Sequence, residues 1–136
     1  MVERYVALAY DAGTLASAAD LPQPLLWPKL SVSESEKTEI AGLFSLPGDR
    51  PVIGFCPGAE FGPAKRWPHY HYAVLAQKLI ARGYRVVLFG SEKDHDVGED
   101  IRHSLDDDDN TCCHNLAGKT SLEQAVVLLA RCAAVV

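Results

Sequence analysis

The feature that most constrains the fold is a short apolar run, Val52–Cys56, which stops at Pro57-Gly58. A loop with a second glycine, Gly62, and two cations leads on to a helix predicted to begin at about Pro68. α/β proteins hold phosphate in such a loop, because backbone N–H groups and the positive end of the helix dipole both point at the anion. The pattern predicts a phosphate-recognising loop at the carboxyl edge of a parallel sheet.

The alternation of strand and helix continues along the chain. The helix predicted from about Pro68 to Arg82 carries an apolar stripe and ends at Gly83. The stripe consists of Tyr72, Leu75, Ala76, Leu79 and Ile80. Tyr84–Phe89 is a near-continuous apolar run, which is typical of a parallel strand covered on both faces. A further helix is predicted from Gly90-Ser91, so the chain is expected to be α/β with a parallel sheet and flanking helices.

The last third of the chain adds one more strand–helix–strand unit. We expect an acidic turn at Asp106–Asp109 and a short strand within Thr111–Leu116. Two overlapping capping boxes, Thr120 with Glu123 and Ser121 with Gln124, precede a helix that runs through Cys132. Its predicted inward face is Leu122, Ala125, Val126 and Leu129. Ala133–Val136 begins another strand, which should run into a loop, so we expect the chain to be part of a larger protein.

The first third predicts a separate segment. The spacing of Val2, Tyr5, Val6 and Ala9 predicts an amphipathic helix over the first ten residues. Leu21–Pro28 is rich in proline and reads as an extended linker. Ser33 and Glu36 form a capping box for a helix through about Phe44. We therefore divide the chain into residues 1–32, a helix and linker, and residues 33–136, the α/β part.

Composition excludes several function classes. The net charge of −5 over 136 residues argues against nucleic acid as a partner. No apolar run approaches the roughly 20 residues that span a bilayer, and the first residues do not resemble a signal peptide. The cysteines are Cys56, Cys112, Cys113 and Cys132, without a CxxC pair. They predict reduced, mostly buried thiols in a cytosolic protein.

Metal ligation is not expected. His69 and His71 fall in a first helical turn, where residues two apart diverge. Cys112-Cys113-His114 has no second ligand pair.

Three groups after strand ends are candidates for ligand contact. In the first loop Lys65 suits phosphate better than Arg66, as a point charge on a flexible stem. After the next strand, Asp94 or Glu92 could accept hydrogen bonds from a ribose, although acidic residues also favour a first helical turn without any ligand. Gly118–Ser121 could line a cleft with backbone amides or be only a capped loop. It is not a Walker A loop, because Cys113 stands where that motif needs glycine.

These residues, in this order, resemble the ADP-heptose:lipopolysaccharide heptosyltransferases. The resemblance is carried by Phe55–Pro68, Val86–Ser91, Asn115–Gly118 and Leu122–Ala125, and it extends to Val2–Tyr5 and Leu21–Pro28. It implies a GT-B architecture of two Rossmann-like domains, of which residues 33–136 would be an incomplete C-terminal, donor-binding domain and residues 1–32 the interdomain segment. The acceptor-binding domain, with its general base, and an Asp-Ser-Gly-x-x-His segment would lie outside this chain.

The resemblance also implies function and site residues. The reaction would transfer heptose from ADP-heptose to the inner core of lipopolysaccharide with inversion, at the cytoplasmic face of the inner membrane and without a cofactor or metal. Lys65 would be catalytic, near the donor diphosphate, and Asp94 would meet the ribose. The full set of implied substrate-binding residues is Gly58, Ala59, Lys65, Asp94 and Gly118. This piece alone is expected to be inactive.

Two rival functions fit the same residues. One is another GT-B glycosyltransferase or a sugar-nucleotide epimerase. The other is a non-catalytic, flavodoxin-like module that binds a nucleotide or has a regulatory role.

Overall fold

The computed structural model describes residues 2–11, 13–25, 29–59 and 63–136. The chain separates into two compact units, residues 1–31 and 32–136. In the first unit, α1 is Val2–Ala7 and a 3₁₀ turn, η1, is Ala18–Asp20. This helix is shorter than predicted, and Tyr5, predicted on its apolar face, is 69% exposed. Residues 26–28 of the predicted linker lie outside the described residues, and its interdomain role stays a prediction.

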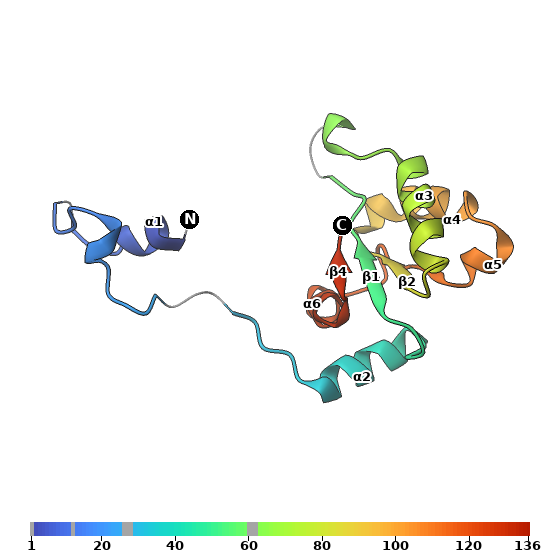
Figure 1. The fold of residues 1–136 in the computed structure, drawn as a ribbon, viewed down its shortest axis with the longest axis horizontal. Helices are drawn as coiled ribbons and strands as arrows, with labels where there is room; N and C mark the ends of the chain where they lie inside the picture. The colour runs from blue at the N-terminus through green and yellow to red at the C-terminus, as the bar shows by residue number, and fades with distance from the viewer. Residues whose placement is uncertain (1, 12, 26–28, 60–62) are drawn as a thin grey trace. The chain divides into compact units, whose positions relative to one another are not determined.

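The second unit is built on a parallel sheet of four strands in the order β3-β2-β1-β4 (Figure 1). The strands are β1 Val52–Phe55, β2 Arg85–Leu88, β3 Cys113–Asn115 and β4 Ala134–Val135. In the central pair, Val52 lies opposite Arg85 and Phe55 opposite Leu88. The predicted α/β class and parallel sheet are confirmed.

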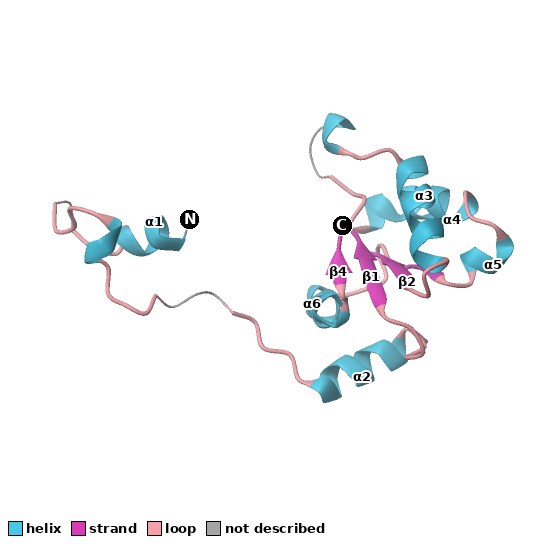
Figure 2. Ribbon diagram, in the orientation of Figure 1, coloured by secondary structure: helices cyan, strands magenta, loops and turns pink. Residues whose placement is uncertain are grey.

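Helices cover both faces of this sheet (Figure 2). The helices are α2 Glu34–Leu43, α3 His69–Ile80, α4 His95–His103, α5 Asp107–Asn110 and α6 Leu122–Arg131. Two 3₁₀ turns, η2 Pro63–Lys65 and η3 Glu92–Asp94, lie in the loops. The core on one face includes side chains of α3 and α4, and the core on the other face includes side chains of α2 and α6.

Successive side chains of a strand point to opposite faces of the sheet, so each central strand contributes to two hydrophobic cores. Ile53 and Phe55 of β1 point toward α3 and α4, and so do Val86 and Leu88 of β2. Val87, between them, packs with Ala41 of α2 and Leu128 of α6 on the opposite face. Burial on both faces explains why these strands read as continuous apolar runs.

Two predicted capping boxes set the helix starts. Ser33 and Glu36 cap α2 reciprocally, as predicted. Of the two overlapping boxes before α6, the one that forms is Ser121 with Gln124.

Three details of the prediction were wrong. The helix expected from Gly90-Ser91 is the turn η3 followed by α4, and the acidic turn at 106–109 continues into the short helix α5. In α6, Leu122 is 80% exposed because it opens the helix, beyond the cover of the sheet, whereas Leu128 is 2% exposed and belongs to the core.

Cys112 and Cys113 are buried and Cys132 is partly buried, whereas Cys56 is exposed; all four thiols are free. Within the residues described, no helix has the length and apolar character needed to cross a membrane.

A charged cluster lies at the amino end of β2. Arg85 is 5% exposed, and its guanidinium donates to Asp49 Oδ1 at 2.9 Å. It also lies 2.8 Å from His114 Nε2. Since arginine can only donate, Nε2 accepts, and the imidazole is neutral with its proton on Nδ1. Burial and the nearby guanidiniums of Arg85 and Arg102 lower the pKa of His114.

This geometry predicts a loss of stability in mild acid. Because the folded state lowers the pKa of His114, the unfolded chain binds the proton more readily. The stability that neutral His114 contributes is fully present above the unfolded-state pKa of about 6.5 and is lost as the pH falls through the lower folded-state pKa. Urea unfolding of the chain between about pH 7 and 5 should show this fall. His114→Gln keeps an acceptor for Arg85, and its unfolding free energy should depend less on pH. Identical pH dependence in His114→Gln and the unaltered chain would show that His114 is not the group responsible.

A matched pair of helix glycines tests the packing of α4. A β-carbon at Gly98 would lie 2.5 Å from the side-chain amide of Asn115, whereas one at Gly42 of α2 would meet nothing within 4 Å. Overpacking destabilises by about 1–3 kcal/mol. The higher helix propensity of alanine than of glycine offsets up to about 1 kcal/mol of this. Gly98→Ala should therefore lower the unfolding free energy by about 1 kcal/mol. Gly42→Ala should leave it unchanged or raise it, and equal effects of the two changes would show that the Gly98 contact is not tight.

Candidate functional site

The candidate site lies where the loops leave the carboxyl ends of β1, β2 and β3. Parallel strands bring these ends to one edge of the sheet, which is where ligands bind in this class of fold. The loops after β1 and β2 line an open pocket of about 250 Å³. Its lining residues are Cys56, Gly58, Ala59, Phe89, Gly90, Ser91 and Asp94. Three of the predicted site residues, Gly58, Ala59 and Asp94, are thus brought together from two loops.

The Asp94 carboxylate is packed tightly between these loops. A β-carbon at Gly58 would overlap this carboxylate, and one at Gly90 would lie 2.7 Å from the Asp94 β-carbon. Ser91 donates to Asp94 Oδ2 from its backbone N–H at 2.9 Å and from its hydroxyl at 2.7 Å. Both carboxylate oxygens lie beside Gly58, and Oδ1 is the nearer to where its β-carbon would be. Asp94 therefore holds the η3 turn and also presents an acceptor at the pocket.

Gly118 ties the third loop to the second. It has φ of +75°, which favours glycine, and its N–H donates to Gly90 O at 3.0 Å. A β-carbon there would also lie 2.8 Å from Glu92 Cα. A second pocket, of about 370 Å³, opens beside this contact. It is lined by Glu92, His95, Asp96, Ala117, Gly118 and Lys119.

The two cations of the first loop have different surroundings. Arg66 donates to Ala59 O at 3.2 Å and so closes the loop on itself. Lys65 ends η2 and is exposed, and it lines neither of these two pockets. The predicted loop residues Glu60, Phe61 and Gly62 lie outside the described residues.

An aromatic cluster leads from this loop into α3. The Trp67 ring stacks on His71 at 5.4 Å and meets Tyr72 edge-on at 4.8 Å. His69 and His71 lie in the first turn of α3, as predicted. Nowhere in the described part of the chain do three or more His, Cys, Asp or Glu side chains gather as a metal site would require.

Several lining residues were missed from the sequence. Phe89, Ser91 and His95 all follow the end of β2 within a few positions, so their place after a strand was the available signal. Cys56 follows β1 in the same way. Although the residue is exposed, partial desolvation at the pocket wall raises the pKa of its thiol, so Cys56 is a neutral group at neutral pH.

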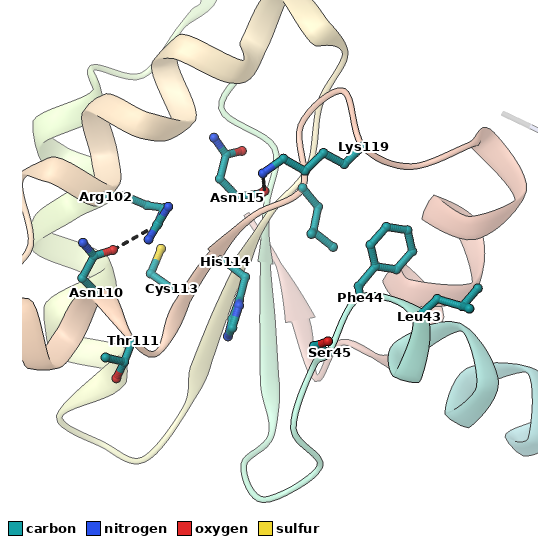
Figure 3. A pocket seen from close by; sticks show the side chains of 11 residues that line it. Leu43, Phe44, Ser45, Arg102, Asn110, Thr111, Cys113, His114, Asn115 and Lys119 are labelled. Carbon is teal, nitrogen blue, oxygen red and sulfur yellow. Dashed lines mark hydrogen bonds between the residues drawn. The ribbon is translucent and has the colours of Figure 1, made fainter.

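A larger pocket, of about 460 Å³, lies along the outer edge of β3 (Figure 3). Its polar groups are engaged within the protein: Arg102 donates to Asn110 at 2.9 Å, and the Lys119 ammonium donates to the backbone oxygen of Asn115 at 3.0 Å. The carboxyl edge is the better candidate site, because glycine backbone and loop carboxylates converge there.

The model of the family described as "Glycosyltransferase family 9 (heptosyltransferase)" matches residues 1–136. The chain is 65% identical to lipopolysaccharide heptosyltransferase 2 of Salmonella typhimurium over 136 residues, which is all of this chain and 39% of that protein. The solved structure of E. coli ADP-heptose lipopolysaccharide heptosyltransferase II is similar with a TM-score of 0.91 and 63% identity, over 99% of this chain and 41% of that one.

A family 9 glycosyl transferase from Veillonella parvula shares the fold, with a TM-score of 0.64 at 24% identity over 78% of this chain and 30% of that one. The chain therefore spans about two fifths of the length of the relatives it matches. With the family model matching every residue, the chain belongs to glycosyltransferase family 9, the heptosyltransferases.

Proposed function

We propose that this chain forms the donor-binding part of an inverting heptosyltransferase that transfers heptose from ADP-heptose to the inner core of lipopolysaccharide. The observation that carries the proposal is the similarity, over 99% of the chain, to a structure described as an ADP-heptose lipopolysaccharide heptosyltransferase. Because the chain spans only 41% of that structure, acceptor binding and the general base are assigned to the rest of such an enzyme. The 136 residues alone are expected to have no transferase activity.

The donor diphosphate is assigned to the loop after β1 and the start of α3. Pro68 gives α3 no side-chain cap, unlike the serines before α2 and α6. The N–H of His71 already donates to Pro68 O at 3.0 Å, so the first-turn N–H groups assigned to an anion are those of His69 and Tyr70. Lys65 is exposed three residues before Pro68. A cation there would stabilise the negative charge that develops on departing ADP. Arg66 is assigned to loop closure, because it already donates to Ala59.

The donor ribose is assigned to the Asp94 carboxylate, with Glu92 as the local alternative. Ser91 donates to Oδ2 of Asp94, so Oδ1 is the oxygen assigned to a ribose hydroxyl. Gly58 and Ala59 allow the backbone to approach the ligand closely beside it, and Gly118 lines the neighbouring pocket. No cofactor or metal enters this scheme.

The partners follow from the same proposal. They are ADP-heptose and the lipopolysaccharide inner core, met at the cytoplasmic face of the inner membrane. The net charge of −5 disfavours nucleic acid.

A chimera tests the function and the role of Lys65. In it, this chain replaces the matching 39% of the Salmonella typhimurium relative. We expect transfer from ADP-heptose but not from other nucleotide-sugars. Lys65→Ala should lower kcat by about 100-fold, because one charge-stabilising group is removed from the transition state.

Lys78→Ala is the matched control, since Lys78 is an exposed lysine in the last turn of α3. It should leave kcat unchanged. Near-normal kcat in Lys65→Ala would refute the role of Lys65, and turnover of a different nucleotide-sugar would favour another GT-B enzyme. Tight ADP binding by the 136 residues alone, together with a sharp melt, would favour the flavodoxin-like module.

Two changes at Asp94 separate its two roles. Asp94→Ala removes the acceptor for Ser91 and should lower the unfolding free energy by about 1 kcal/mol. Asp94→Asn keeps that acceptor and should preserve stability. Loss of the charge-assisted bond to ribose should nevertheless raise the donor KM of Asp94→Asn by about tenfold. If Asp94→Asn keeps the normal KM in the chimera, Asp94 is a cap and not a ligand.

A further inference from the structure

Asn115, the last residue of β3, has an environment that the proposed function does not use. Its side chain is 4% exposed, and among the described residues only Arg85 is another polar side chain so buried. Asn115 lies opposite Leu88 in the register with β2, directly before the loop that carries Gly118. A buried amide at the end of an edge strand needs partners for its two N–H groups and its oxygen.

Those partners join α4 to the third loop. Asn115 Nδ2 donates to the backbone oxygen of His95 at 3.0 Å and to Glu99 Oε1 at 2.8 Å. Asn115 Oδ1 accepts from the backbone N–H of Ala117 at 3.1 Å. The donors face only acceptors and the oxygen faces only a donor, so the orientation of the amide is determined by its surroundings.

The contacts leave little room for another residue type. Aspartate would place a carboxylate against Glu99 and against the His95 carbonyl, with no proton to donate to either. Burial alone would raise the pKa of Glu99, but the Asn115 hydrogen bond and the nearby Arg102 and His95 lower it, so Glu99 stays ionised. Gly98 is also required, because a β-carbon there would meet the Asn115 amide.

The segment that Asn115 holds is the wall of the second pocket. Ala117, Gly118 and Lys119 line that pocket with His95, whose backbone oxygen is an Asn115 partner. Gly118 also donates to Gly90 O, so the loop after β3 is linked to the loop after β2 by this backbone bond and to α4 by the Asn115 side chain. Without the Asn115 side chain, residues 117–119 would depend on the Gly118 bond, on the longer contact of His95 Nδ1 with Ala117 O at 3.4 Å, and on bonds within their own loop.

We propose that Asn115 is a positioning residue that fixes the backbone of residues 117–119 against α4 and thereby sets the affinity for the nucleotide-sugar donor. The proposal rests on the proposed function for its ligand, but not for the positioning itself. Asn115 touches no substrate in this scheme; it acts through the Ala117 N–H and the loop that follows.

The first arm of the test measures positioning on the 136-residue chain by amide hydrogen exchange. Asn115→Asp should speed exchange at the Ala117 and Gly118 amides by about tenfold or more, since the two bonds that hold this segment against α4 are lost. Exchange at Val87, in the centre of the sheet, should change much less. The matched control is Asn110→Asp, in which the new carboxylate can still accept from Arg102. Unchanged exchange at residues 117 and 118 in Asn115→Asp would overturn the proposal.

The second arm measures kinetics in the chimera with the Salmonella typhimurium relative. Asn115→Asp should raise the KM for ADP-heptose by about tenfold, with kcat and the acceptor KM within about threefold of the parent. Adding Glu99→Gln to Asn115→Asp should restore much of the donor KM, because the new glutamine amide can donate to the new aspartate. A fall in kcat with an unchanged donor KM would overturn the proposal. A double variant whose donor KM is as high as that of Asn115→Asp would also overturn it.

Two possible failures of the experiment, a variant that does not fold and an inactive chimera, can each be interpreted. If Asn115→Asp does not fold, Asn115→Ser removes the links to α4 without adding a buried charge, and the same exchange and KM changes are expected of it. If the chimera carrying the unaltered chain is inactive while its parent relative is active, the proposed function fails. The exchange arm then still decides whether Asn115 positions the loop.

Discussion

The structure depends on one constraint, which is the burial of the β1–β2 pair on both faces. The two strands bond to each other in parallel register, and helices cover them above and below. Neither face is left for a polar ligand, so chemistry is confined to the edges of the sheet. At the carboxyl edge, every strand must give way to a loop, and the three loops after β1, β2 and β3 supply the glycines and carboxylates of the candidate site.

The way these loops are joined gives the site its character. Asp94 joins the first loop to the second by filling the space beside Gly58 and Gly90. Gly118 and Asn115 join the third loop to the second and to α4. Lys65 stands apart, as an exposed cation on η2 rather than a member of either pocket. In the proposed function, the packed loops would meet the nucleotide, and Lys65, on its long side chain, would meet the charge that appears only during reaction.

The sequence correctly predicted those features of the fold that depend on residues close together in the chain. Continuous apolar runs located β1 and β2, the stripe of α3 was recognisable from Tyr72 to Ile80, and the Ser33–Glu36 box marked the start of α2. It failed where a contact between distant residues decides. The sequence predicted Leu122 on the inward face of α6. The core residue is Leu128, which packs in the same cluster as Val87, and that long-range contact cannot be inferred from the helix alone. The spacing of Ser91 and Asp94 is that of a capping box, but nothing local indicates that the same carboxylate fills the space beside Gly58, or that Asn115 turns inward to Glu99.

The packing around Asp94 has a consequence for how such sequences can diverge. The Asp94 side chain occupies the space that a side chain would need at position 58, mainly with its carboxylate, and at position 90, mainly with its β-carbon. These three positions, which lie in two loops separated by a strand and a helix, must therefore change as a set. A relative that gains a β-carbon at position 58 needs a shorter side chain at position 94, and a different capping group for η3 to go with it. A β-carbon at position 90 would meet the β-carbon of residue 94, so it needs glycine at position 94 or a shift of the backbone. Variation at these positions across related sequences should be correlated rather than independent.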